Sequence, residues 1–235
     1  KNSLENTLVD LEKKHKVHIA VYTSKDLKGQ KAGDAANKLV DKIAPGAENG
    51  AMALVLDMKS YDDVKREVSV FAQVTGEKEK GDALLKEMET KVQDVVARLP
   101  KDKKRIAILH STAQGLSVQL DGSIAGSIAK MLGWDNVASG MTPMEKNPDA
   151  APYSMETLVE QNPEIIFVTS MGKLEEIKQN MEATIAASPA WQSIPAIQKG
   201  QVYYLPQDLF LLSPGLRYPE AFETMAKLVY PEVFK

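Results

Sequence analysis

The sequence contains no cysteine in 235 residues. This absence excludes disulfide bonds, thiolate metal sites, iron–sulfur ligation and a cysteine nucleophile. Neither sign of charge is in large excess, since the formal net charge is only −3. The sequence therefore has no electrostatic footprint for binding nucleic acid. No apolar run approaches the roughly 18 residues that a membrane-spanning helix needs. The hydrophobic fraction of 43% is ordinary for a globular protein.

Common enzyme motifs are missing as well. No Gly-x-Gly-x-x-Gly follows a strand-like run and no Walker loop occurs, which argues against a nucleotide enzyme. The segment 122–126 places its serine one position short of the nucleophile elbow of α/β-hydrolases. His15 and His18 are interpreted as solvated turn residues, since no third ligand lies nearby in the sequence. We therefore predict a protein that is not an enzyme, with no catalytic residues, no cofactor and no metal site of its own.

A unit of helix, strand, helix and strand occurs twice in the sequence. The first copy begins at Ser3-Leu4-Glu5 and the second at Ser154-Met155-Glu156. Each copy continues through an apolar run, a Thr-Ser pair and a helical stretch to another apolar run. This repeat predicts two similar α/β lobes that work in the cleft between them.

A long charged helix is expected over 78–99, between the two copies. Its apolar side chains form a single stripe, and Pro100 ends it. We interpret it as a rigid connector across both lobes. The predicted divisions are a partial N-terminal lobe at 1–75, the connector at 76–100 and a C-terminal lobe at 101–235.

The two lobes are expected to differ in size. About 50 residues (105–153) precede Ser154, whereas two precede Ser3, so the first lobe is predicted to lack its opening strand, helix and strand. An incomplete lobe would expose an unpaired strand edge, which favours self-association. In the second lobe we predict strands at 105–110, 165–168 and 202–205, helices at 122–132 and 173–187, and loops at 111–121 and 139–153.

Glu5 and Glu156 occupy the same place in the two copies. Each lies two residues after a serine that is expected to cap a helix, whereas a capping box needs its acid three residues after the cap. A helix-dipole role would contribute about 0.3–1 kcal/mol each. Two repeated carboxylates would equally suit docking to a pseudo-symmetric partner with basic pockets, and both interpretations stay open.

Motifs across nearly the whole chain resemble the substrate-binding proteins of ABC importers for ferric siderophores, haem and cobalamin. In the second half these are Asn162-Pro163-Glu164-Ile165-Ile166-Phe167-Val168, the stretch 190–205 and Leu212-Ser213-Pro214-Gly215-Leu216-Arg217. In the first part they are Ser3-Leu4-Glu5, Lys42-Ile43-Ala44-Pro45, Tyr61-Asp62-Asp63-Val64 and Thr75-Gly76-Glu77-Lys78-Glu79, in the family's order.

The resemblance implies an α/β fold of two three-layer lobes joined by a single long connector helix, here with the N-terminal lobe incomplete. It also implies an extracytoplasmic receptor, periplasmic or anchored as a lipoprotein, whose signal segment is not among these residues. The implied ligand is a ferric siderophore, haem or cobalamin held between the lobes. Glu5 and Glu156 would pair with arginines of the membrane permease.

In such a fold the carboxyl ends of the parallel strands face the cleft and should carry the ligand contacts. The predicted ligand-binding residues are Tyr22, His110, Ser111, Thr112, Gln114, Met171, Asp208, Phe210 and Arg217.

Several of these positions have a structural interpretation too. His110 would equally serve as a structural or solvent-facing histidine, and Arg217 either pairs with an anionic chelate or forms a surface salt bridge. Met141 and Met144 either ligate haem iron or anchor their loop. Trp191 is expected in the core.

Two other classes of protein stay open. One is an α/β protein that binds a macromolecular partner without a small-molecule ligand. The other is a subunit of a nitrogenase-like oxidoreductase, against which the absence of cysteine argues because cluster ligation relies on cysteine.

Overall fold

The computed structural model describes residues 60–112, 115–172 and 174–234. These residues belong to one compact unit, Met58–Lys235. The predictions for the first copy of the repeat, the incomplete lobe and its exposed strand edge lie outside the described residues. So do those for Glu5, His15, His18, Tyr22 and Gln114.

Two helices open the described part of the chain: α3 (Tyr61–Thr75) and α4 (Lys78–Arg98). A capping box fixes the start of α3, because the Ser60 hydroxyl accepts from the Asp63 amide (3.1 Å) and the Asp63 carboxylate accepts from the Ser60 amide (2.9 Å). Gly76 ends the helix with a φ of 73°, a left-handed conformation that glycine adopts without steric cost. The long amphipathic helix predicted at 78–99 is confirmed as α4.

The described residues contain one sheet of six strands in the order β4-β2-β1-β5-β6, with β3 beside the start of β1. Strands β1, β3, β5 and β6 are parallel, whereas β2 runs antiparallel to both of its neighbours. The strands are β1 (Arg105–Thr112), β2 (Gly115–Gln119), β3 (Asp135–Asn136), β4 (Ala150–Pro152), β5 (Ile165–Ser170) and β6 (Val202–Tyr204).

The predicted loops at 111–121 and 139–153 are wrong in part. Strand β1 continues to Thr112, and β2 turns back against it, with Gly115 at a φ of 136°. Strand β4 then pairs with β2. Neither segment has a continuous apolar run, but Val118 of β2 and Ala151 of β4 are buried in the same cluster and hold these strands on the sheet.

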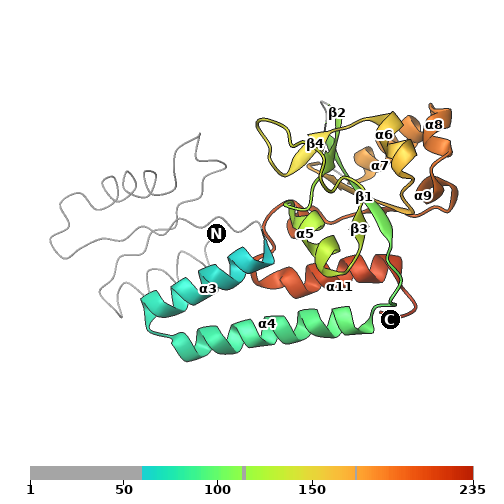
Figure 1. Cartoon of the computed structure of the whole chain (residues 1–235). Helices are drawn as coiled ribbons and strands as arrows, with labels where there is room; N and C mark the ends of the chain where they lie inside the picture. Colours follow the sequence, from blue (N-terminus) through green and yellow to red (C-terminus); the bar gives the residue numbers. More distant parts are fainter. Residues whose placement is uncertain (1–59, 113–114, 173, 235) are drawn as a thin grey trace, which may run out of the picture. The chain divides into compact units, whose positions relative to one another are not determined.

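Helices cover both faces of the sheet (Figure 1). Along β1, Ile106 and Ile108 pack with α4 and α11, whereas Ala107 and Leu109 pack on the opposite face, where Trp191 is buried as predicted. This period of two gives the three-layer α/β arrangement that was predicted. The remaining helices are α5 (Ile124–Met131), α6 (Met155–Gln161), α7 (Leu174–Ala186), α8 (Pro189–Gln192), α9 (Pro195–Gln198), α10 (Gln207–Phe210), the 3-10 turn η1 (Gly215–Arg217) and α11 (Tyr218–Val229).

Helix α3 shares its core with α4 and α11. Tyr61 and Val64 are buried in the same cluster as Met88 of α4 and Phe222 of α11. Figure 1 shows these three helices grouped on one side of the sheet. The segment 61–75, predicted as part of the N-terminal lobe, thus lies in the same compact unit as the sheet.

Candidate functional site

The carboxyl ends of β1, β5 and β6 lie at one edge of the sheet, because these strands are parallel neighbours. The register pairs His110 with Thr169, Ser111 with Ser170, and Val168 with Tyr204. In open α/β sheets this edge is the usual place for ligands. We call it the carboxyl edge, and it carries most of the predicted ligand residues that the structure describes.

His110 is half-buried at the end of β1 and is fixed by a hydroxyl. The Thr169 hydroxyl donates to the Leu109 carbonyl (3.3 Å) and lies 3.1 Å from Nδ1 of His110. The Thr169 hydroxyl therefore holds the ring in place through Nδ1, whereas Nε2 has no hydrogen-bond partner in the described part of the sheet. Burial lowers the pKa of His110, so the ring is neutral near pH 7.

Ser111 and Thr112 complete the end of β1. Ser111 is half-buried between β2 and β5. Thr112 is exposed, and its hydroxyl donates to the Gly115 carbonyl (3.1 Å), which stabilises the turn into β2. Both residues thus lie at the predicted edge, and Thr112 has a structural contact there.

A cavity of about 220 Å³ opens at the ends of β5 and β6. Met171 directly follows β5 and is 67% exposed. Tyr204, Leu174 and Ile177 were not predicted as cavity residues, although Tyr204 lies in the strand predicted at 202–205. The cavity is lined by Val168, Ser170, Gly172, Leu174, Ile177, Tyr204, Leu205, Pro206 and Gln207.

Arg217 is held by two carboxylates. Its Nε and Nη2 donate to Glu220 (2.7 and 2.8 Å), and its Nη1 donates to Asp208 (2.8 Å). The guanidinium lowers the pKa of Glu220 by this hydrogen bonding. Since all three side chains are exposed, this arrangement matches the surface salt bridge that was the structural interpretation of Arg217.

Phe210 lies in the core instead of at the ligand edge. Its side chain is only 2% exposed and packs in the cluster that includes Leu209 and Phe222. The prediction of Phe210 as a ligand contact conflicts with this packing. The segment 207–210 forms the short helix α10, which turns Phe210 inward while Asp208 stays exposed.

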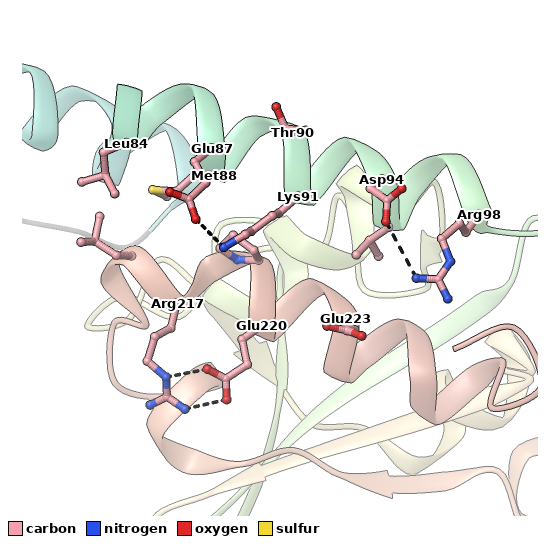
Figure 2. A pocket seen from close by; sticks show the side chains of 13 residues that line it. Leu84, Glu87, Met88, Thr90, Lys91, Asp94, Arg98, Arg217, Glu220 and Glu223 are labelled. Carbon is pink, nitrogen blue, oxygen red and sulfur yellow. Dashed lines mark hydrogen bonds and ion pairs between the residues drawn. The ribbon is translucent and has the colours of Figure 1, made fainter. Parts of the chain in front are cut away.

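A second hollow, a groove, lies in the helical layer on the α11 side of the sheet. It has a volume of about 640 Å³ and lies between α4 and the start of α11 (Figure 2). Its charged side chains largely pair among themselves, as Lys91 does with Glu87 at 2.6 Å. This groove was not predicted from the sequence, because a groove between two helices forms only when those helices pack together.

Glu156 is exposed in the first turn of α6, as predicted. The Ser154 hydroxyl caps this helix by accepting from the Thr157 amide (3.3 Å). The cap therefore does not use the Glu156 carboxylate.

Residues 12–209 match the family described as periplasmic binding protein. The chain belongs to this family. It is 27% identical over 201 residues to the Fe(3+)-citrate-binding protein YfmC of Bacillus subtilis, covering 84% of this chain and 57% of YfmC. It is 23% identical over 185 residues to the ABC transporter substrate-binding lipoprotein YvrC of the same species, covering 77% of this chain and 54% of YvrC. The chain thus spans about half the length of the curated relatives it matches.

The solved structures agree in fold. The crystal structure of Staphylococcus aureus IsdE complexed with heme aligns with a TM-score of 0.64 at 19% identity, covering 77% of this chain and 69% of IsdE. A structural match at such a low sequence identity shows a shared fold, here the two-lobe α/β architecture of periplasmic binding proteins.

None of the described helices is long and apolar enough to cross a membrane. Within the described ranges, no group of three or more histidine, aspartate and glutamate side chains is placed to hold a metal ion.

Proposed function

We propose that this protein is an extracytoplasmic solute-binding protein that delivers an iron chelate, either a siderophore or haem, or a corrinoid to an ABC importer. The observation that carries the proposal is the family match over residues 12–209. A relative named for Fe(3+)-citrate and a fold neighbour that holds heme support a chelate as the ligand.

The carboxyl edge supports a binding role. It has a cavity, exposed apolar side chains and a neutral histidine, which suit the non-covalent holding of a ligand. We assign ligand contacts to His110, Ser111, Thr112 and Met171 among the described residues, and to Tyr22 and Gln114 outside them.

The partner in this proposal is a membrane permease. Glu156 is exposed and is not needed for the cap of α6, which supports a docking role. Glu5 would supply the matching carboxylate from the first copy of the repeat. The lipoprotein name of the relative YvrC supports a location outside the cytoplasm, in the periplasm or on a membrane anchor. We also propose that 76–100 connects two lobes at 1–75 and 101–235, with α3 at the end of the first lobe packed against α4 and α11. We further propose that the protein has no catalytic activity.

A ligand panel tests the proposal. The protein encoded by the natural gene is titrated with haem, cobalamin, ferric citrate, and hydroxamate and catecholate ferric siderophores. Binding is followed by ligand absorption and by quenching of Trp134 and Trp191, which are both buried. We expect one of these compounds to bind with a Kd of about 1 μM or below. No binding by any of them would contradict the proposed function.

A further inference from the structure

The cavity at the ends of β5 and β6 has a largely apolar wall. Aliphatic side chains and the Tyr204 ring form most of it, and none of the described lining residues is charged at neutral pH, since burial raises the pKa of Tyr204. The Lys178 ammonium lies 5.8 Å from the centre of the Tyr204 ring and 3.7 Å from Glu175, but Lys178 is not a lining residue. A group that enters this cavity therefore meets hydrocarbon and an uncharged ring.

The protein core holds this wall in place. Val168 is 1% exposed and packs in the cluster with Trp191, whereas Leu205 is 4% exposed and packs in the cluster on the other face of the sheet. Leu174 and Ile177 lie three residues apart on α7, so they share one face of that helix. A wall fixed in this way loses little conformational entropy when a ligand binds.

The size of the cavity limits what it holds. Its volume of about 220 Å³ is below the roughly 300–1,000 Å³ of pockets that enclose a whole drug-sized ligand. It exceeds the roughly 150 Å³ of an apolar cavity that binds benzene. The cavity therefore fits one ring-sized group rather than an entire metal chelate.

The remainder of a chelate has a surface to rest on beside the cavity. Ser170 lines the cavity and pairs with Ser111 in the register of β5 and β1. His110 precedes Ser111 at the same edge of the sheet. A ligand with one group in the cavity thus extends along the carboxyl edge to the proposed contacts of β1.

We propose that this cavity is a subsite for one uncharged, ring-sized apolar group that projects from the metal chelate, such as an aryl ring or the hydrocarbon edge of a macrocycle. The inference rests on the proposed function and adds the part of the ligand that Leu174, Ile177 and Tyr204 recognise.

The first test compares ferric benzohydroxamate with ferric acetohydroxamate. Both are uncharged complexes that hold iron through the same hydroxamate group, and they differ in a phenyl ring against a methyl group. Calorimetric titration should show that the phenyl complex binds about tenfold or more tightly, because the cavity removes the ring from water. Equal affinities, or no binding of the phenyl complex, would overturn the inference. The proposed function stands in that case if a chelate of the ligand panel binds, and falls with the inference if none does.

The second test assigns the preference for the phenyl complex to the cavity. Leu174→Asn places an amide in the wall and should lower that preference by about threefold or more. The control Leu216→Asn alters a similarly exposed leucine of the groove between α4 and α11, 51% against 47% exposed, and should keep the preference within about 1.5-fold. Should Leu174→Asn fail to fold, as judged by its circular dichroism, Leu174→Ala takes its place. A folded Leu174 variant with the full preference would contradict the inference.

Discussion

At the scale of single residues, His110 combines a ring held in place by a hydroxyl with a neutral charge near pH 7. The Thr169 hydroxyl holds Nδ1, and burial disfavours the imidazolium. A neutral imidazole offers a polar nitrogen to a ligand without adding a positive charge. Arg217 is fixed in the opposite way, since its charge is permanent but is compensated by two carboxylates.

The charge state of His110 predicts a pH dependence of stability. Its pKa in the folded protein lies below the ordinary value of 6.5, so the unfolded chain binds a proton more readily than the folded one. The free energy of unfolding should therefore fall as the pH drops below about 6.5 towards the folded pKa. His110→Gln should remove this part of the fall. Urea unfolding of both proteins at several pH values from about 7.5 down to about 5 measures this difference. Identical pH profiles for the wild type and His110→Gln would contradict a lowered pKa of His110.

At the scale of secondary-structure elements, α3 and α4 meet at a glycine. A Cβ added to Gly81 would collide with the Cβ of Ala72. Since Cβ atoms move only with their backbones, the two helices would have to separate. Gly81 is thus needed for the close packing that joins α3 to the rest of the compact unit.

Gly81→Ala should therefore destabilise the protein by about 1–3 kcal/mol, although alanine favours a helix over glycine by about 1 kcal/mol. Ala72→Gly removes the methyl group in the way and should recover part of the loss in the double variant. Chemical denaturation of the four proteins gives the coupling energy between the two sites. If the effects of the two substitutions simply add, the predicted contact is wrong.

The sequence predicted those elements whose apolar pattern is continuous. The stripe of α4 has a helical period, and β1 and β5 each contain a short continuous apolar run, so both types of element were placed correctly. Strand β2 was missed, because Gly115 and the polar residues around it hide a period of two behind a turn.

The candidate site was predictable only in part. The rule for parallel strands placed His110, Ser111 and Met171 at the right edge. It did not distinguish Asp208 from Phe210, because only the packing of α10 decides which of them faces the core. The two carboxylates that hold Arg217 also come together only when α10 lies against α11.

At the scale of the whole molecule, the proposed docking role of Glu5 and Glu156 predicts a loss of transport without a loss of stability. Glu156→Ala should change stability by no more than about 1 kcal/mol, because only a helix-dipole contribution is lost. Transport should nevertheless fall steeply in the double variant Glu5→Ala/Glu156→Ala, since each unpaired permease arginine would cost about 2–5 kcal/mol. Ligand affinity should not change. Glu160→Ala, an exposed carboxylate at the other end of α6, is the matched control and should transport normally.

The most direct test of the account is uptake by living cells. A strain that lacks the natural gene is supplied with labelled haem, cobalamin, ferric hydroxamates, catecholates and ferric citrate, and accumulation is measured over time. We expect uptake of one of these ligands to be lost, the wild-type gene to restore it, and the gene with both glutamates replaced by alanine to fail. Unchanged uptake of every ligand in the deletion strain would contradict a role as the receptor of an importer.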